Sequence, residues 1–442
     1  MIIQSVIRAL TNFPKFLHTY SFLKESQWWK KEQLEEYQLQ QLKKLLDHSY
    51  ENVPYYTKIF DKLNLTPKDI NSFEDLHKIP YLTKDIVRKN INDLKATNYP
   101  EHKFENLSTG GSSGQPLQFY IEKGDWLPKM MAYTKIQSNW AGRSYFDKWV
   151  NIAGGENPFE YQLFGRTLAL SSFYMNDKYF PSFIQKIRKF KPKHILSYPS
   201  AITNLAIYMK RNNIEFFPSV KSILCVSETL YEWQREILEE FFQCRVYNQY
   251  CLRESVALGI SCENSNFFHM FPEFGITELI DQKDKQVKKE DEIGEIVGTS
   301  LLNYIFPFIR YKTGDLGVYT ATKCSCGRNY PRLKRIEGRL QEFVVSKSNQ
   351  LISLTGVYGL IAKVSPNVKE CQFYQDRKGE IIIKIVKTDN YSKSDSQIIQ
   401  NSIQKRFGSE FNIKISQVDH ISRTKTGKYQ FLIQKLPIKL TH

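Results

Sequence analysis

The chain has no long apolar run and no low-complexity segment. No apolar stretch reaches the roughly 18 residues needed to cross a bilayer. The first residues, MIIQSVIRALTNF, have no basic region ahead of the apolar ones, so they predict an amphipathic helix and not a secretion signal. Seven cysteines are an odd number in a long chain, which argues against a disulfide framework. These absences predict a soluble cytoplasmic protein without a membrane span.

Charge is unbalanced, with a formal net charge of +16. Such an excess suits nucleic acid, an acidic membrane surface or an anionic substrate. The lysines are interleaved with acids and apolar residues, and no nucleic-acid module pattern accompanies them. We therefore predict a solvated basic surface and no nucleic-acid partner. Weak attraction to a membrane surface or a nucleotide is the remaining alternative.

The 442 residues suffice for two or three domains. Residues 1–75 predict a helical lead-in, because apolar residues recur there at three- and four-residue spacing. From about residue 100 onward, β-rich runs alternate with helical stretches, which predicts an α/β fold with a parallel or mixed sheet. The expected strands are 149–153, 194–198, 220–226 and 245–248, and a helix is expected over 230–242.

After Gly338-Arg339 the pattern changes to a smaller unit. Its expected elements are a hairpin over 342–353, a helix, a strand over 381–386, a second helix over 393–407 and a lysine-rich tail. The predicted domains are therefore 1–338 and 339–442.

A glycine–hydroxyl segment, Ser108-Thr109-Gly110-Gly111-Ser112-Ser113-Gly114-Gln115-Pro116, follows the first β-rich run. Glycines let the backbone approach a ligand closely, so that N–H groups converge on phosphate oxygens. The segment lacks the Lys-Ser/Thr ending of a Walker loop, so a P-loop fold is not predicted. Taken alone, a flexible glycine–serine turn explains it equally well.

Further motifs follow in a fixed order. They are Ser227-Glu228-Thr229-Leu230, Tyr250-Cys251-Leu252-Arg253-Glu254, Tyr311-Lys312-Thr313-Gly314-Asp315-Leu316, Arg335-Ile336-Glu337-Gly338-Arg339 and Arg423-Thr424-Lys425-Thr426-Gly427-Lys428. Each motif is weak singly, but the ordered set resembles the adenylate-forming superfamily of acyl-CoA synthetases, peptide-synthetase adenylation domains and luciferases. The resemblance is closest to the phenylacetate–CoA ligase-like branch, which includes capsule-biosynthesis proteins. It runs from about residue 30 to the end.

The resemblance implies a large N-terminal domain of mixed β-sheets and helices, with a small mobile C-terminal α+β domain. It implies an enzyme that uses ATP and Mg²⁺ to activate a small carboxylic or amino acid as an acyl-adenylate. The acyl group would pass to coenzyme A, a carrier thiol or an amine such as an amino sugar, in surface polysaccharide biosynthesis. A homodimer is left open.

The resemblance also implies roles for the nucleotide-binding residues. The segment Thr109, Gly110, Gly111, Ser112, Ser113 and Gly114 would hold the β- and γ-phosphates of ATP. Ser227, Glu228 and Thr229 would line the adenine and acyl pocket, with Tyr250 stacking on the adenine. Asp315 would accept hydrogen bonds from both ribose hydroxyls, as a fixed carboxylate can.

Three catalytic residues are implied in the same way. Glu254 would hold Mg²⁺, Arg339 would reach the ribose–phosphate end, and Lys428 would bridge the substrate carboxylate and the α-phosphate. A carboxylate attacking a phosphate brings two anions together, so cations must neutralise them at the transition state. No nucleophilic side chain is required.

The sequence departs from the family pattern at Gln115, Cys251 and Gln341. Gln115 stands where many relatives carry lysine, Cys251 replaces a glycine, and Gln341 replaces the hinge aspartate. These departures leave an alternative function open, that of a catalytically weakened relative acting as a binding or scaffold component of a polysaccharide assembly pathway.

A metal site is suggested by Cys324-x-Cys326, which Cys262-x6-His269 precedes. Three thiolates and an imidazole satisfy four-coordinate zinc. The phenylacetate–CoA ligase-like branch has a similar arrangement, which implies a structural zinc; reduced thiols are the alternative. Cys225, Cys244 and Cys371 flank apolar residues and are expected in the core.

The acid pocket is expected to draw on Trp140, Tyr198, Pro199, Ser200 and residues 225–230. Their aromatic content hints at a planar or apolar acid.

Overall fold

The computed structural model describes residues 2–109, 117–144, 146–163, 165–339, 343–348, 351–354, 361, 364–424 and 427–436. The chain forms two compact units, each assembled from separate stretches. The first unit contains Met1–Ser144 and Gln249–Arg335, and the second contains Tyr145–Asn248 and Ile336–His442. The predicted boundary between 338 and 339 lies near the end of the first unit, and the proposed two-domain division stays a prediction.

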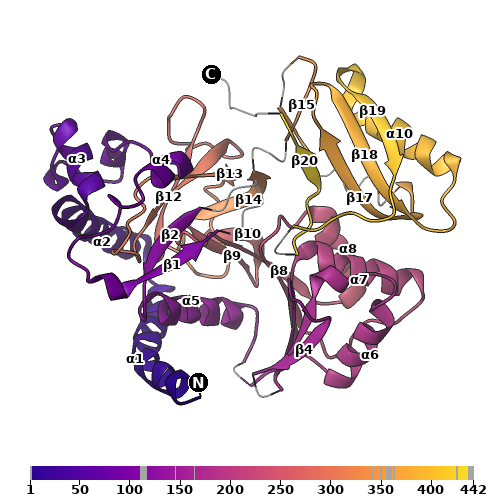
Figure 1. Ribbon diagram of the computed structural model, residues 1–442, viewed down its shortest axis with the longest axis horizontal. Coiled ribbons are helices and arrows are strands. Elements are labelled where there is room, and N and C mark those ends of the chain that lie inside the picture. The colour runs from indigo at the N-terminus through magenta and orange to yellow at the C-terminus, as the bar shows by residue number, and fades with distance from the viewer. Residues whose placement is uncertain are drawn as a thin grey trace. The chain divides into compact units, whose positions relative to one another are not determined.

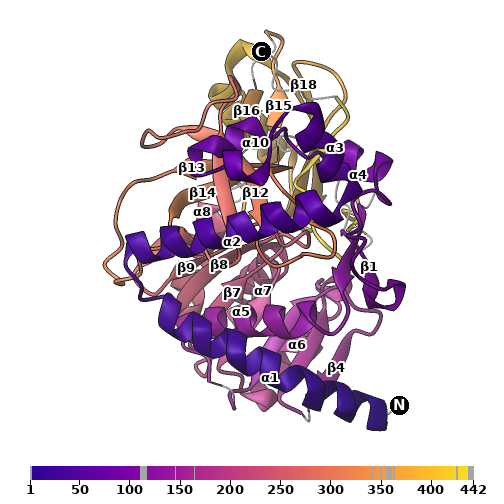
Figure 2. The same cartoon turned by 90° about the vertical axis from the view of Figure 1, so that its left-hand side faces the viewer.

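Helices dominate the start of the first unit. They are α1 (Ile2–Ser26), α2 (Lys31–Asn52), α3 (Pro54–Lys62), α4 (Lys84–Lys89) and α5 (Trp126–Trp140), with short 3₁₀ turns at Pro67–Asp69, Glu74–Lys78 and Glu101–Lys103. In α2, Leu34, Leu42 and Leu46 recur at helical spacing and are buried, which accounts for the side of the helix that packs inward. Helix α1 lies alongside α5 (Figure 2), where Lys15 Nζ is 2.7 Å from Asp125 Oδ1.

The strands of the first unit are mainly antiparallel. Strands β1 (Phe104–Ser108) and β2 (Gln118–Glu122) pair as a hairpin. The larger sheet has the order β11-β12-β13-β14-β10-β9. Its strands are β9 (Leu258–Cys262), β10 (Ser265–Met270), β11 (Gly275–Ile280), β12 (Ile293–Ser300), β13 (Tyr311–Tyr319) and β14 (Arg332–Arg339), which continues into the second unit.

The core of the first unit joins α2 and α3 to the segment that precedes β13. Tyr56 is buried and donates its hydroxyl to the carbonyl of Pro307 over 3.1 Å. The backbone of Leu82, just before α4, pairs with β13: its N–H donates to the carbonyl of Arg310 over 3.0 Å, and it accepts from Lys312 N over 2.9 Å. The start of α4 is thereby held beside β13.

The second unit begins with a parallel sheet. Its order is β8-β7-β6-β3-β5-β4, with only β4 antiparallel to its neighbour among these described strands. The strands are β3 (Trp149–Ala153), β4 (Phe159–Gln162), β5 (Thr167–Ser171), β6 (His194–Ser197), β7 (Ser222–Cys225) and β8 (Arg245–Cys251), and the helices are α6 (Phe180–Phe190), α7 (Pro199–Arg211) and α8 (Glu232–Phe242), with a 3₁₀ turn at Ser172–Tyr174. The repeated strand-then-helix order (Figure 1) confirms the predicted α/β class.

The C-terminal part of the second unit holds a four-stranded sheet of order β19-β18-β17-β20. Its elements are β15 (Phe343–Val345), β16 (Leu351–Ser353), β17 (Val368–Gln375), β18 (Glu380–Lys387), α10 (Lys393–Phe407), a 3₁₀ turn at Gly408–Glu410, β19 (Asn412–Gln417) and β20 (Leu432–Gln434). Alternate isoleucines of β18, Ile381, Ile383 and Ile385, are buried in one cluster with Ile399 and Ile403 of α10. The sequence predicted β18 and α10 but not β17, and the helix expected between 353 and 381 falls largely outside the described residues.

Within the part of the chain that the structure describes, no helix combines the length and the apolar character needed to span a bilayer.

Candidate functional site

The parallel sheet of the second unit brings several predicted residues to one edge. In β3, β5, β6 and β7 the carboxyl ends lie at the same edge, which is where open α/β sheets bind ligands. Gly154, Ser172, Tyr198 and Ser227 follow these ends in turn. Ser227 has a positive φ of 67°, a left-handed conformation that costs free energy for a residue with a side chain. This strained corner turns the predicted Ser227-Glu228-Thr229 segment away from β7.

Lys428 lies in a tight turn at that edge. Gly427 N donates to Thr424 O over 2.8 Å, and Lys428 N donates to Thr424 Oγ1 over 3.0 Å. Ser172 Oγ donates to Gly427 O over 2.9 Å, which ties the turn to the end of β5. Gly427 has a φ of 77°, and a Cβ there would approach Ser172 Oγ and the backbone of Gly154 closely, so glycine is favoured at this position.

Glu228 joins the turn to the sheet edge. Its Oε1 accepts the backbone N–H of Tyr429 over 2.6 Å, and its Oε2 accepts that of Ser200 over 3.1 Å. Burial raises the pKa of the Glu228 carboxyl, although these hydrogen bonds and Arg423 oppose the shift. The role expected for Glu228 in the adenine and acyl pocket stays a prediction, as do those of Ser227 and Thr229.

In the first unit, Asp315 lies in a bulge of β13. The register shifts so that Thr313, Gly314 and Asp315 together oppose Ile296 of β12. Thr313 Oγ1 donates to Ile296 O over 2.7 Å, and Asp315 N donates to Thr313 Oγ1 over 3.0 Å. Gly314 supplies the positive φ of 77° that the bulge needs. Tyr250 donates its hydroxyl to Asp315 Oδ2 over 2.9 Å, so the bulge directs the carboxylate toward the end of β8.

Glu254 is buried close to Asp315. Its Oε1 accepts the hydroxyl of Tyr311 over 3.1 Å. Burial raises the pKa of the Glu254 carboxyl; the positive charge of Lys84 lowers it, and the negative charge of Asp315 raises it further. The sequence reasoning missed Lys84, because no motif marks Thr83-Lys84, and only the pairing of Leu82 with β13 places α4 there.

The glycine–hydroxyl segment begins beside Arg253, the residue before Glu254. Thr109 N donates to Leu117 O, and Leu117 N donates to Thr109 Oγ1, both over 2.9 Å, so the two ends of the segment are held together. Arg253 Nη1 donates to Ser108 O over 2.8 Å. Gly110, Gly111, Ser112, Ser113, Gly114 and Gln115 lie outside the described residues.

The predicted site residues therefore form two groups. Thr109, Tyr250, Glu254 and Asp315 gather in the first unit, whereas Glu228 and Lys428 gather in the second. Arg339 ends β14, and Gln341 lies outside the described residues. Whether all of these groups surround one nucleotide stays a prediction.

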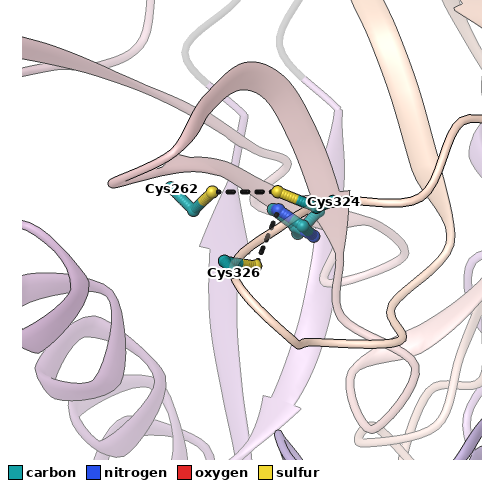
Figure 3. Close-up of side chains that lie close together, drawn as sticks. Cys262, Cys324 and Cys326 are labelled. Carbon is teal, nitrogen blue, oxygen red and sulfur yellow. Dashed lines mark hydrogen bonds between the residues drawn. The ribbon is translucent and has the colours of Figure 1, made fainter.

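The four predicted metal ligands converge in the first unit (Figure 3). The ligand atoms of Cys262, His269, Cys324 and Cys326 all lie within 4.8 Å of one another. Cys262 Sγ is 3.5 Å from Cys324 Sγ, and Cys326 Sγ is 3.6 Å from His269 Nε2. A tetrahedral zinc site separates two sulfurs by roughly 3.8 Å and sulfur from nitrogen by roughly 3.6 Å. The residues present fit zinc.

The surroundings of the cluster keep its histidine in the form that can ligate a metal. Burial and the nearby Arg332 and Arg328 lower the pKa of His269 to about 3, so its imidazole is neutral and can ligate a metal. Trp140, expected in the acid pocket, instead packs against His269 with ring centroids 5.8 Å apart. Its indole N–H donates to Gln27 over 2.9 Å, so Trp140 belongs to the core around the cluster.

The other cysteines are separate from the cluster. Cys225 and Cys371 are buried, as expected, and Cys244 is partly buried. Cys251 is exposed at the end of β8.

The chain is similar to several known proteins. Residues 344–435 match the model of the CapK C-terminal domain. The chain is 26% identical over 412 residues to protein CapK of Staphylococcus aureus, covering 91% of this chain and 89% of that protein. It is 24% identical over 369 residues to the phenylacetate-coenzyme A ligase of Thermus thermophilus, covering 79% and 80%, respectively.

Solved structures resemble the chain over most of its length. A 2-hydroxyisobutyryl-CoA ligase in the postadenylation state aligns with a TM-score of 0.75 and 18% identity, covering 93% of both chains. An anthranilate CoA ligase in complex with anthranoyl-AMP aligns with a TM-score of 0.54 and 15% identity, covering 80% of this chain and 73% of that one. The comparisons confirm the resemblance to the CapK and phenylacetate–CoA ligase-like proteins and confirm the fold. The named relatives other than CapK are ligases, the enzyme class that the motifs predict.

Proposed function

We propose that this chain is an ATP-dependent ligase that activates a carboxylic acid as an acyl-adenylate. The observation that carries the proposal is the grouping of Thr109, Tyr250, Glu254 and Asp315 at the base of the glycine–hydroxyl segment. A bound nucleotide requires three kinds of group. Backbone N–H groups bind its phosphates, one carboxylate binds its metal ion, and another carboxylate binds its ribose.

The roles within the nucleotide group follow from these contacts. Asp315, held by Tyr250, is the acceptor for the ribose hydroxyls. Glu254 is the residue for Mg²⁺, which when bound neutralises phosphate charge. Lys84 adds a positive charge near Glu254, in a sequence that has Gln115 where many relatives carry lysine.

Lys428 supplies the positive charge that we propose for the reaction of the acid with ATP. A carboxylate oxygen of the acid attacks the α-phosphate of ATP, the bond to the β-phosphate breaks, and pyrophosphate leaves with its electrons. Lys428 binds the acid's carboxylate and the α-phosphate and reduces the repulsion between them. Its position at the carboxyl edge of the sheet, beside the segments expected to hold the acid, supports this role.

Coenzyme A is the acceptor that we propose, because the phenylacetate-coenzyme A and 2-hydroxyisobutyryl-CoA relatives are named for it. A carrier thiol or an amine is the alternative acceptor. The similarity to CapK supports a role in capsule polysaccharide biosynthesis. Nothing observed in the described residues favours the scaffold alternative over an enzyme.

A structural zinc at Cys262, His269, Cys324 and Cys326 completes the proposal. When bound, zinc would tie the β9–β10 hairpin to the connection between β13 and β14, and so stabilise the sheet that carries Asp315.

The test is pyrophosphate exchange into ATP with a panel of aromatic, hydroxy and amino acids, followed by thioester formation with coenzyme A. Exchange that depends on one acid class, and that the Asp315→Ala variant loses, supports the proposal. Absence of exchange with every acid, in protein that binds ATP, would favour the scaffold function instead.

A further inference from the structure

Glu228 connects two parts of the second unit that are far apart in the sequence. One carboxylate oxygen accepts the N–H of Ser200, in the first turn of α7, and the other accepts the N–H of Tyr429, directly after Lys428. A carboxylate can accept two such bonds because it has only acceptor atoms. The side chain is partly buried, which makes these bonds stronger than they would be in open water.

Two further contacts hold the same turn. Ser172 donates to the carbonyl of Gly427, on the other side of Lys428. Arg423 pairs with Glu370, whose Oε1 also accepts Asn204 Nδ2 of α7 over 3.0 Å. The residues before and after Lys428 are therefore both anchored, which restricts the position of its backbone.

We propose that Glu228 is a positioning residue that holds the Lys428 turn against the start of α7. We name the two bonds from Glu228 to Ser200 and Tyr429 the Glu228 latch. This inference rests on the proposed function, in which Lys428 acts on the acid during adenylation. The latch sets the fraction of molecules in which Lys428 is in place, so it controls the rate of adenylation and not the affinity for ATP.

The test compares the Glu228→Gln variant with Glu240→Gln. Glutamine presents one oxygen and one NH₂ group, so one of the two backbone N–H groups loses its acceptor. Glu240 is an exposed glutamate that pairs with Lys210 at the surface, and its substitution removes the same charge. The measurements are amide hydrogen exchange of two peptides, one containing Ser200 and one containing residues 427–431, and the kcat and KM for pyrophosphate exchange.

If the latch acts as proposed, the amide that loses its acceptor in Glu228→Gln, Ser200 or Tyr429, should exchange faster than in the wild type. The kcat should fall roughly 10- to 100-fold, with the KM for ATP unchanged. Glu240→Gln retains wild-type values. Identical amide exchange and kcat in the two variants would overturn the inference. A raised KM for ATP with unchanged amide exchange would also overturn it, because that result would place Glu228 in the nucleotide pocket.

Failure of the proposed function and failure of the Glu228→Gln variant to fold can each be distinguished from failure of the latch. If the wild-type protein shows no pyrophosphate exchange with any acid, the proposed function fails, but amide exchange at Ser200 and Tyr429 still tests the latch. If Glu228→Gln does not fold, Ser172→Ala is measured in the same way, because it removes the contact on the other side of Lys428. Unchanged amide exchange and kcat in Ser172→Ala would then count against an anchored turn.

Discussion

Tyr250 donates its hydroxyl to Asp315 Oδ2 over 2.9 Å, which fixes the carboxylate that the bulge of β13 directs toward the end of β8. Because Thr313 and Gly314 form the bulge, the position of Asp315 depends on backbone geometry as well as on this hydrogen bond. The pair is therefore preorganised before any ribose binds.

Replacing Tyr250 with phenylalanine should weaken ATP binding. The substitution removes one hydrogen bond to a charged oxygen and leaves the ring, so the dissociation constant should rise roughly 10-fold. Isothermal titration with ATP measures the change. Tyr247→Phe in the same strand, β8, is the control and should bind ATP as the wild type does. Equal affinity in Tyr250→Phe and the wild type would show that this contact does not orient Asp315.

Replacing Lys428 with alanine should abolish most adenylation while leaving ATP binding largely intact. The proposed ammonium acts on charge that develops during attack, and loss of such a group lowers kcat roughly 100- to 1,000-fold. Pyrophosphate exchange measures the rate of adenylation, and titration with ATP measures the affinity for the nucleotide. Lys414→Ala, on β19 of the same unit, is the control for loss of a lysine. An unchanged exchange rate would show that Lys428 is misassigned.

Replacing Cys324 with serine should remove zinc and destabilise the first unit. One of four ligands is lost, and the buried His269 and Cys262 then face each other without a cation. Native mass spectrometry should show one zinc per wild-type chain and none in the variant, with a lower Tm. Cys244→Ser, outside the cluster, is the control and should retain zinc. A wild-type protein that is folded and free of zinc would contradict the site.

Much of the fold was predictable because its signals are local. The strand over 149–153 and the helix over 393–407 were predicted with the observed bounds, since the spacing of apolar residues is read along the chain. Strand β17 was missed, because its residues Val368–Gln375 mix charged and apolar side chains without a clear alternation.

The candidate site was predictable in its residue types but not in its contacts. The convergence of Cys262 and Cys324 agrees with the ligand spacing, whereas no motif predicts the contact of Trp140 with the ligand His269, because it depends on how distant elements pack. The bonds from Glu228 to backbone N–H groups could not be predicted, because they depend on how the turn at Lys428 packs against the sheet edge.

Magnesium activation should weaken at mildly acidic pH. Burial raises the pKa of Glu254, and magnesium needs the ionised carboxylate, so affinity falls as pH drops through this raised pKa. The magnesium concentration for half-maximal pyrophosphate exchange, measured across a pH series, tests this. Lys84→Met removes a nearby positive charge, so the loss should begin at a higher pH than in the wild type. An identical pH dependence in the two proteins would contradict the proximity of Lys84 and Glu254.

The buried ion pair of Arg310 and Glu278 should be a sensitive point for stability. Arg310 Nε and Nη2 donate to the two oxygens of Glu278 over 3.1 and 2.9 Å, and Nη1 donates to the carbonyl of Ile79 over 2.8 Å. Glu278→Ala leaves an unpaired charge in the interior and should lower the free energy of unfolding by about 3–5 kcal/mol. Denaturant unfolding measures the change, with Asp93→Ala, which breaks the exposed pair with Lys58, as a control that stays near wild type. The double substitution Glu278→Leu and Arg310→Met should cost less than Glu278→Ala alone, because it leaves no buried charge. If the double variant were the less stable of the two, the unpaired arginine would not be the cause.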